Sequence, residues 1–242
     1  MKNNNKKTFI IIGATGGIGS VLTTSFYKQG YNLVLSSRKL PELEKLAYAM
    51  DESRVLVVAA DATNSDDIER LYAEAKSKFG TIDAIVVSAG SWEQLSIDKP
   101  LKEASALADK HYQIFFKIPF NAVYGAQEVF RDQKRLLILN ISSHTAVRFD
   151  LDGNMTYSPM KAASHALIYN LIHELKINKI VNIKACDLMP AIVNTKEAAK
   201  WLDTAEKKAM AVQPEAIAAW IIENVDNDHI ESEKLFLSKL VL

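Results

Sequence analysis

Short runs of consecutive apolar residues alternate along the chain with longer segments in which apolar residues recur every three or four positions. The runs are rich in β-branched and aliphatic residues, and this pattern is typical of parallel strands that are buried on both faces of a sheet. We predict seven such strands, at residues 8–12, 32–35, 55–59, 84–87, 135–141, 180–185 and 235–237.

The segments between these runs have recognisable helix ends. Pro41 suits a first helical turn, Asn64 can cap a helix over 65–79 that stops at Gly80, and Pro214 can open a helix over 215–225. Strands that alternate with helices predict a three-layer, doubly wound α/β fold of the Rossmann type. We expect a mostly parallel seven-stranded sheet with helices on both faces.

Nothing in the sequence divides the chain, so we expect residues 1–242 to form a single domain. Three stretches do not fit the alternation of strands and helices: 91–101, 144–155 and 191–213. Each follows a predicted strand, and in open α/β sheets the ligand crevice lies outside the carboxyl ends of the strands. We therefore predict that these stretches are substrate loops.

The charge balance narrows the range of functions. Among 242 residues, 29 Lys and Arg balance 29 Asp and Glu, so the chain lacks the basic excess that binders of nucleic acids or anionic membranes use. Cys186 is the single cysteine, and the five histidines show no metal-ligand spacing, so we expect no metal site. No apolar run approaches the roughly 20 residues of a membrane span. We expect a cytoplasmic protein that binds neither nucleic acid nor membrane.

A glycine-rich turn directly follows the first predicted strand, where residues 13–19 read GATGGIG and open a helix that reaches about Gln29. Glycines let the backbone approach a pyrophosphate, and the N–H groups and dipole at a helix start attract its charge. The turn predicts a dinucleotide site, with contacts from Gly13, Thr15, Gly16, Gly17, Ile18 and Gly19.

The end of the second predicted strand indicates which dinucleotide is bound. Proteins that bind NAD place an acidic residue there, about 20 positions after the turn, to hold the adenosine ribose. This chain has Ser37 and Arg38 instead. A guanidinium can pair bidentately with a 2′-phosphate, so we expect NADP(H) to be preferred and keep NAD(H) as the alternative.

Two later motifs complete a pattern that resembles a known family. Residues 140–143 read Asn-Ile-Ser-Ser at the end of the fifth predicted strand, and residues 157–161 read Tyr-Ser-Pro-Met-Lys near the start of a helix. With the glycine turn, they resemble the short-chain dehydrogenase/reductase family over nearly the whole chain. The resemblance implies an oxidoreductase that interconverts a small-molecule carbonyl and an alcohol by hydride transfer, with NADP(H) as cofactor.

The resemblance also implies roles for individual side chains. Tyr157 would exchange a proton with the substrate oxygen, Ser143 would hold that oxygen, and Lys161 would contact both the phenol and the cofactor. Residues four apart on a helix are neighbours, and a nearby cation favours a phenolate. We therefore expect the pKa of Tyr157 to lie below its usual value of about 10. In the helix before Pro119, Gln113 aligns with a family asparagine linked to a proton relay, and we expect it in the catalytic site.

Other cofactor contacts implied by the resemblance match more loosely. They are Asp61, Ala62, Ala89, Gly90, Tyr157, Pro190, Ile192 and Thr195. Asp61 either lies near the adenine or belongs to the turn before the next helix. Val87 and Ser88 replace two family asparagines, and residues 233–242 lack the frequent Asp-Gly-Gly ending.

Two alternative functions stay open. The spacing of Gly13, Gly16 and Gly19 also suits nucleotide-sugar epimerases and dehydratases, although these usually carry a further substrate domain after the last strand. The altered asparagines and Gln113 would suit a protein that senses the dinucleotide without turnover. The resemblance further implies a homodimer or homotetramer that forms through the helix at 161–176. The sequence does not identify the substrate; His144, Trp92 and Trp201 are candidates for lining its pocket.

Overall fold

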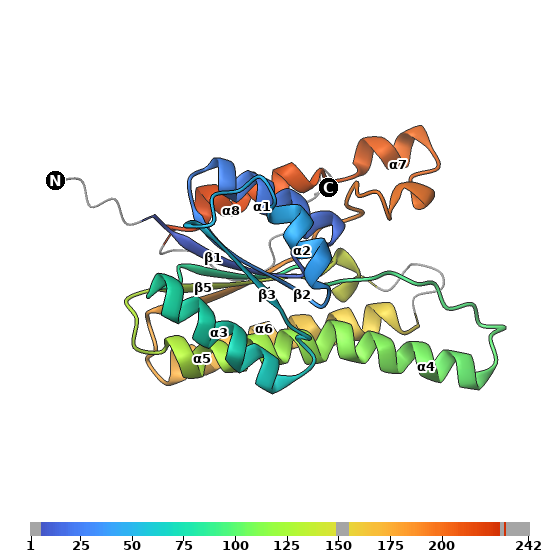
Figure 1. The fold of residues 1–242 in the computed structure, drawn as a ribbon. Coiled ribbons are helices and arrows are strands. Elements are labelled where there is room, and N and C mark those ends of the chain that lie inside the picture. Colours follow the sequence, from blue (N-terminus) through green and yellow to red (C-terminus); the bar gives the residue numbers. More distant parts are fainter. Residues whose placement is uncertain (1–5, 149–154, 228–229, 231–242) are drawn as a thin grey trace.

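Parallel strands form one sheet in the computed structural model, which describes residues 6–148, 155–227 and 230 (Figure 1). The strands are β1 (Thr8–Ile12), β2 (Asn32–Ser37), β3 (Val55–Ala59), β4 (Ala84–Val87), β5 (Leu136–Ile141) and β6 (Ile183–Leu188). Their order in the described sheet is β3-β2-β1-β4-β5-β6, and every neighbouring pair is parallel. This confirms the predicted doubly wound α/β fold, whereas the strand expected at 235–237 lies outside the described residues.

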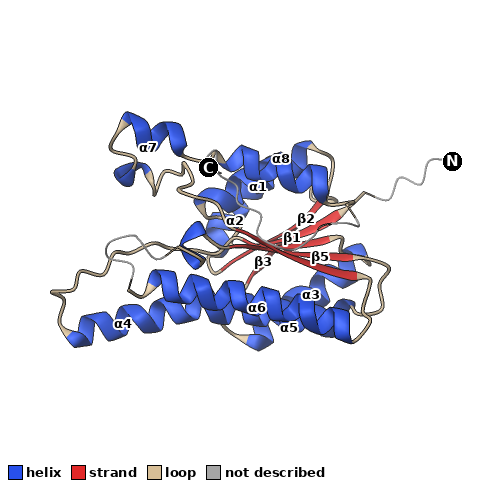
Figure 2. Ribbon diagram, turned by 180° about the vertical axis from the view of Figure 1, so that it is seen from behind, coloured by secondary structure: helices blue, strands red, loops and turns tan. Residues whose placement is uncertain are grey.

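Helices connect these strands and cover both faces of the sheet. They are α1 (Gly17–Lys28), α2 (Leu40–Ala47), α3 (Ser65–Phe79), α4 (Leu101–Tyr112), the π-helix η1 (Gln113–Lys117), α5 (Ile118–Phe130), the short 3₁₀ helix η2 (His144–Ala146), α6 (Tyr157–Ile177), the 3₁₀ helix η3 (Ala199–Trp201), α7 (Ala205–Met210) and α8 (Pro214–Asn224). Figures 1 and 2 show α1, α2 and α8 on one face of the sheet, and α3, α5 and α6 on the other. The three predicted layers are therefore present.

Alternate residues of the central strand β1 pack into two separate hydrophobic cores. Phe9 and Ile11 belong to the core under α1 and α8, whereas Ile10 and Ile12 belong to the core under α3, α5 and α6. All four side chains are at most 2% exposed. Burial of each such side chain stabilises the fold by about 1.5–3 kcal/mol. The continuous apolar run in the sequence reflects a strand that is covered on both sides.

The ends of α3 follow the sequence prediction. The Asn64 side chain accepts a hydrogen bond of 2.8 Å from the Asp66 backbone N–H, which satisfies one of the unpaired donors of the first turn. At the other end, Gly80 has φ of 75° and its N–H donates to the carbonyl oxygen of Lys76. Glycine adopts this left-handed conformation without a steric penalty, so it ends the helix.

Strand β6 lies further along the chain than predicted, over Ile183–Leu188 rather than 180–185. The Ile180 N–H donates to the Leu175 carbonyl at 2.9 Å, and Lys179 has a left-handed φ of 55°, so the residues after α6 form its closing turn. The strand then continues through Asp187, a carboxylate that is only 2% exposed. Because Asp187 interrupts the apolar run, the hydrophobic pattern of the sequence did not indicate where this buried strand ends.

Helices α4 and α5 form one long rod that is interrupted by η1 (Figure 2). The interruption lies just before Pro119, which has no N–H to donate to the carbonyl one turn back. In η1 the Ile118 N–H donates instead to the carbonyl oxygen of Gln113, five residues earlier. This wider turn lets the helix continue through the proline, and such π-helical turns are frequent at functional sites.

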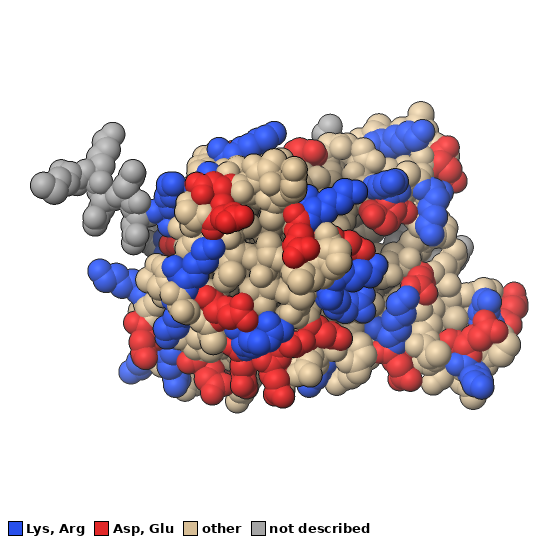
Figure 3. Space-filling model, in the orientation of Figure 1, with Lys and Arg blue, Asp and Glu red and all other residues tan. Residues whose placement is uncertain are grey.

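The surface carries both signs of charge, and Figure 3 shows acidic and basic side chains mixed over the face in view. Within the described part of the chain, no helix combines the length and hydropathy needed to cross a bilayer. The same residues contain no group of three or more His, Cys, Asp and Glu side chains that could hold a metal ion.

Candidate functional site

Strand β5 and helix α6 bring three of the predicted catalytic side chains together at the carboxyl edge of the sheet. β5 ends at Ile141, and Ser143 follows in an extended conformation and caps η2. Tyr157 is the first residue of α6, and Lys161 lies one turn further along the same helix. The Ser143 hydroxyl makes a hydrogen bond with the Tyr157 phenol. Ser143, Tyr157 and Lys161 therefore form one cluster.

The Lys161 ammonium is enclosed by the protein, with 5% of the residue exposed. Its Nζ donates to the Ile141 carbonyl at 3.2 Å and lies 4.5 Å from the centre of the Phe115 ring. Burial disfavours the cation and lowers the pKa of Lys161 to about 8, although the Asp187 carboxylate opposes this shift. The side chain therefore changes charge close to physiological pH.

The pKa of Tyr157 differs from the sequence expectation. Burial of the phenol raises its pKa to about 12, and the hydrogen bond with Ser143 opposes the rise only in part. Lys161 does not produce the expected lowering, because its Nζ lies 5.8 Å from the centre of the Tyr157 ring and donates to Ile141 instead. The phenol consequently holds its proton at neutral pH.

Helix α4 and η1 supply the aromatic surroundings of Tyr157. The ring centres of Phe115 and Tyr157 are 5.0 Å apart, and those of His111 and Tyr157 are 6.0 Å apart, both in edge-on geometry. His111 and Phe115 lie one helical turn apart, so they present their rings on the same side of the rod. Both are buried, with exposures of 0% and 2%.

The expectation that Gln113 lies in the catalytic site is not supported by its position. The Gln113 side chain is exposed, whereas His111 and Phe115 contact Tyr157. Residues two apart on a helix do not face the same way, so Gln113 lies on the other side of the rod from these two rings. Gln113 therefore does not join the cluster of Ser143, Tyr157 and Lys161 in this structure.

A network of buried polar side chains supports the cluster from behind. The Asn140 Nδ2 donates to Asp187 Oδ1 at 2.7 Å and to Ser164 Oγ at 3.0 Å, and His165 Nδ1 lies 2.9 Å from Asp187 Oδ2. These contacts join β5, β6 and α6. Asp187 also favours the charged form of Lys161, so the network acts on the site both mechanically and electrostatically.

The glycine turn lies against the ends of β2 and β4. Gly13 has φ of 90°, and its N–H donates to the Ser36 carbonyl at 2.8 Å. A Cβ atom at Gly13 would lie 2.7 Å from the backbone nitrogen of Ala89, and one at Gly19 would overlap the Gly13 carbonyl oxygen. The glycines are therefore required for close approach, and the turn packs on the predicted contact residue Ala89.

The start of α1 fits an anionic group. The helix begins with no side-chain cap on Gly16 and no acidic residue in its first turn, so its first amide groups are not satisfied by capping side chains. Thr195 and Glu197 from the loop after β6 cover this end, and a Cβ atom at Gly17 would lie 2.5 Å from Glu197 Oε2. The Glu197 carboxylate therefore lies beside the backbone N–H groups at the start of α1, which would attract a phosphate.

The end of β2 presents the predicted 2′-phosphate contacts. Arg38 is exposed, and no ion pair joins it to another residue of the described part of the chain. The Ser37 hydroxyl is buried and has no hydrogen-bond partner there. A guanidinium and a hydroxyl next to each other fit a phosphate group.

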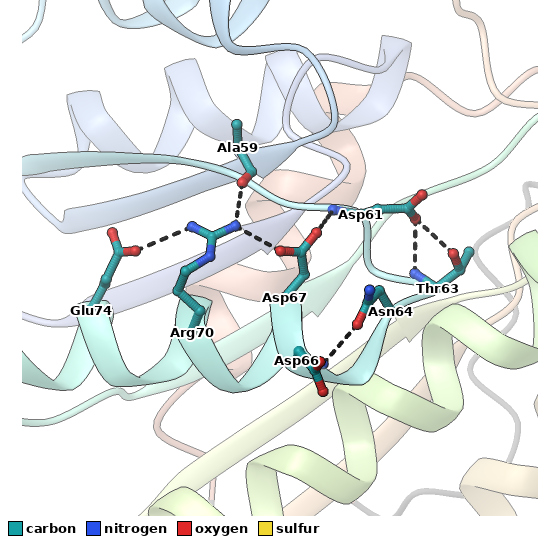
Figure 4. A network of polar contacts seen from close by, with 8 residues as sticks. All are labelled: Ala59, Asp61, Thr63, Asn64, Asp66, Asp67, Arg70 and Glu74. Atoms are coloured by element: carbon teal, nitrogen blue, oxygen red, sulfur yellow. Dashed lines mark hydrogen bonds and ion pairs between the residues drawn. The ribbon is translucent and has the colours of Figure 1, made fainter.

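Asp61 takes part in the turn before α3, which Figure 4 shows. Its Oδ1 accepts from the Thr63 N–H and hydroxyl, at 3.0 and 2.8 Å, and its own N–H donates to Asp67 Oδ2. Its neighbour Ala62 accepts from the Asn121 side chain of α5 at 3.0 Å. Asp61 therefore belongs to the turn before α3, which was one of the two expectations for it. A contact with adenine would use its other carboxylate oxygen, Oδ2.

The loops that follow β5 and β6 are joined to each other. The His144 N–H donates to the Pro190 carbonyl at 3.0 Å, and the Val212 N–H donates to the Ile192 carbonyl at 2.9 Å. Ile192 is 38% exposed. These bonds hold the predicted contact residues Pro190 and Ile192 beside the catalytic edge, and residues 149–154 of the intervening loop lie outside the described residues.

Two of the predicted substrate loops meet through tryptophans. The ring centres of Trp92 and Trp201 are 4.0 Å apart, in edge-on contact. Glu93 beside Trp92 forms an ion pair with Lys110 of α4, which attaches the first loop to the rod. The contact brings the stretches 91–101 and 191–213 together.

Several residues of this site were not singled out by the sequence analysis. They are His111, Phe115, Asp187 and Glu197. The repeat of aromatic rings at one-turn spacing in α4 and η1 could have indicated that His111 and Phe115 share a face. No local pattern could have indicated Glu197 or Asp187, because their neighbours come from distant parts of the sequence.

Comparison with known proteins gives the family context. The family model described as short chain dehydrogenase matches residues 7–206. An uncharacterized oxidoreductase of Staphylococcus aureus (strain USA300) is 27% identical over 218 residues, which cover 89% of each chain. One from Staphylococcus saprophyticus is 29% identical over 230 residues, covering 90% of this chain and 89% of the relative.

Solved structures share the fold at lower sequence identity. A 3-ketoacyl-(acyl-carrier-protein) reductase from Brucella melitensis, complexed with NADH, has a TM-score of 0.82 at 20% identity and covers 96% of each chain. The protein ElxO with NADP bound has a TM-score of 0.80 at 20% identity, covering 93% of this chain and 94% of ElxO.

Proposed function

This chain belongs to the short chain dehydrogenase family of oxidoreductases, and on that premise we propose that it interconverts a small-molecule carbonyl and an alcohol with NADP(H). The observation that carries the proposal is the cluster of Ser143, Tyr157 and Lys161 at the carboxyl edge of the sheet, the edge at which the glycine turn follows β1. These side chains match the hydroxyl, phenol and ammonium that such a reaction requires.

The chemistry follows from the state of each side chain. NADPH, when bound, supplies a hydride to the carbonyl carbon. The Tyr157 phenol, with a pKa of about 12, is protonated at neutral pH and donates its proton to the carbonyl oxygen, which the Ser143 hydroxyl also binds. The phenolate that remains then recovers a proton from water, and the Lys161 ammonium would contact the cofactor, as the family resemblance implies. A protonated phenol favours the direction of reduction.

The cofactor would lie across the carboxyl ends of β1, β2 and β4 to β6. The turn residues Gly13 to Gly19 and the start of α1 would hold the pyrophosphate, and Thr195 would lie near the nicotinamide. Among the solved neighbours, one carries NADH and another NADP, so the fold does not decide between them. Arg38 is exposed, lies beside Ser37 and forms no ion pair with the residues that the structure describes, and this supports NADP(H).

The test is NADPH oxidation over a panel of aldehydes, ketones, quinones, sugars and acyl thioesters. With any substrate found, Tyr157→Phe should abolish turnover and leave NADPH binding nearly unchanged, because it removes the proton donor but not the phosphate site. Tyr169→Phe, on the exposed side of α6, is the matched control and should keep full activity. Turnover that survives in Tyr157→Phe would favour epimerase-like chemistry, and NADPH binding without turnover of any class would favour the sensor.

The proposal includes assembly as a homodimer or homotetramer. Along α4, η1 and α5, the rings of Tyr112, Phe116, Phe120 and Tyr124 stack in succession, with centres 5.7–6.1 Å apart. Tyr112 is 42% and Tyr124 is 64% exposed, and a groove beside them is lined by residues of α6 such as Leu167. Such an exposed aromatic patch suits a second copy of the chain, and light scattering after gel filtration would measure the mass of the assembly.

A further inference from the structure

His111 is buried beside the catalytic cluster of Ser143, Tyr157 and Lys161. The side chain is 0% exposed, and its Nδ1 lies 2.9 Å from the hydroxyl of Thr156. Thr156 directly precedes Tyr157 and is the N-cap residue of α6. Its hydroxyl makes no capping bond to α6, so it is committed to His111 instead.

The ring of His111 also limits where the Tyr157 ring can lie. Its centre is 5.2 Å from that of Phe115 and 6.0 Å from that of Tyr157. Phe115 in turn contacts both the Tyr157 ring and the Lys161 ammonium. A change in the position of the imidazole would therefore alter the surroundings of the proton donor and of the cation.

The second nitrogen of the imidazole has an unusual environment. The Nε2 of His111 is buried and has no hydrogen-bond partner among the described residues. Leaving a buried polar atom unpaired costs about 1–3 kcal/mol, and native proteins keep few such atoms. Protonation of the ring would make the cost higher, because Nε2–H would then carry part of a buried positive charge.

On the premise of the proposed function, we propose that neutral His111 is a positioning residue: its Nδ1 bond to Thr156 fixes the first turn of α6 and thereby orients the Tyr157 phenol for proton transfer. Protonation of His111 disturbs this arrangement and lowers turnover in acid.

Burial is the main reason why His111 favours its neutral form, because it lowers the pKa of the ring. The cations of Lys110 on α4 and Lys161 on α6 lower this pKa further, whereas Glu93 in the loop after β4 and a backbone hydrogen bond with Thr156 oppose the shift. An unperturbed histidine has a pKa near 6.5. The acid limb of the pH–rate profile is therefore expected below about pH 6.5, and it should belong to this ring.

Four substitutions separate the roles of the ring. His111→Phe keeps a ring and removes both nitrogens, and Thr156→Val removes the hydroxyl at nearly constant shape. Each should lower kcat at least about tenfold with the KM for NADPH unchanged. The double variant His111→Phe/Thr156→Val should have a kcat no lower than either single variant, because both substitutions remove the same hydrogen bond. His111→Asn places an amide where Nδ1 lies, and Thr156→Ser keeps the hydroxyl, so both should restore most of kcat.

The pH profile distinguishes positioning from simple packing. His111→Asn cannot titrate in this range, so its acid limb should disappear while its kcat at neutral pH is largely kept. His173→Asn, at an exposed position of α6, is the matched control and should leave the acid limb in place. Full kcat in His111→Phe and Thr156→Val, or an acid limb unchanged in His111→Asn, would overturn the proposal.

A measurement without substrate separates this proposal from the proposed function. In protein labelled with 3-fluorotyrosine, the ¹⁹F resonance of Tyr157 is assigned by its loss in Tyr157→Phe. His111→Phe and Thr156→Val should shift or broaden it, and His111→Asn should not. If no substrate is found, the proposed function fails, but this resonance still decides whether His111 positions Tyr157. If His111→Phe does not fold, Thr156→Val provides the same test, and an unchanged resonance there refutes the proposal.

Discussion

Gly13→Ala tests whether the glycine turn is fixed by close packing against β4 as well as by its backbone conformation. Gly13 has φ of 90°, and an added Cβ would lie 2.7 Å from the nitrogen and 2.9 Å from the Cα of Ala89. Both atoms belong to the backbone two residues after β4 ends, so the overlap cannot be relieved by turning a side chain. Gly30 has a similar φ of 95° with nothing within 4 Å of the added Cβ, and it is the matched control.

The magnitude follows from these two contributions. A left-handed conformation costs an alanine roughly 1–2 kcal/mol relative to its preferred one, and overpacking against a rigid neighbour costs about 1–3 kcal/mol more. Gly30→Ala should therefore lower the free energy of unfolding by about 1–2 kcal/mol, and Gly13→Ala by about 2–5 kcal/mol. Replacing glycine by alanine also lowers the conformational entropy of the unfolded chain, which stabilises both variants equally. This contribution therefore cancels when the two variants are compared.

The assay is urea unfolding of the cofactor-free protein, followed by far-ultraviolet circular dichroism. The denaturant slope should stay constant, so that a change in midpoint reports stability. NADPH affinity supplies a second readout: Gly13→Ala should lose it, whereas Gly30→Ala, in the turn between α1 and β2, should keep it. Equal midpoints for the two variants would refute the packing argument, because they would mean that the segment at Ala89 moves aside without cost.

Three further outcomes are expected. Ser37→Asp combined with Arg38→Leu should weaken NADPH binding and improve NADH use, because a carboxylate replaces the cation at the ribose; tighter NADH than NADPH binding by the unmodified protein would contradict the assignment. Glu197→Gln should strengthen NADPH binding several-fold, since it removes a negative charge beside the start of α1. Glu206→Gln, at an exposed site, is the control. Equal NADPH affinities of Glu197→Gln and the unmodified protein would mean that Glu197 moves away from the phosphate site when the cofactor binds. Turnover should fall as pH rises through about 8, where the Lys161 ammonium loses its proton, and a flat profile across that range would show that the charge is not required.

Local patterns in the sequence were sufficient for much of the fold. The bounds of β1, β3 and β4 and the cap of α3 by Asn64 were predicted correctly, because each depends on contacts within a few residues or on continuous burial. The glycine turn and the spacing of Tyr157 and Lys161 are equally local, since one turn of helix separates these two side chains. Such features can be predicted from the amino-acid sequence alone, without knowledge of the tertiary contacts.

Tertiary packing decided what the sequence pattern left open or gave wrongly. The rise of the Tyr157 pKa to about 12 depends on burial by groups from several elements, and no spacing along α6 contains that information. Whether His111 or Gln113 contacts Tyr157 depends on which side of the rod, interrupted by a π-helical turn, faces α6. Glu197 reaches Gly17 across most of the chain length. Side chains lose their hydration and meet residues from distant segments only after the layers of the fold have packed. The sequence by itself therefore determined which chemical groups are present, and the tertiary packing determined their charge and orientation.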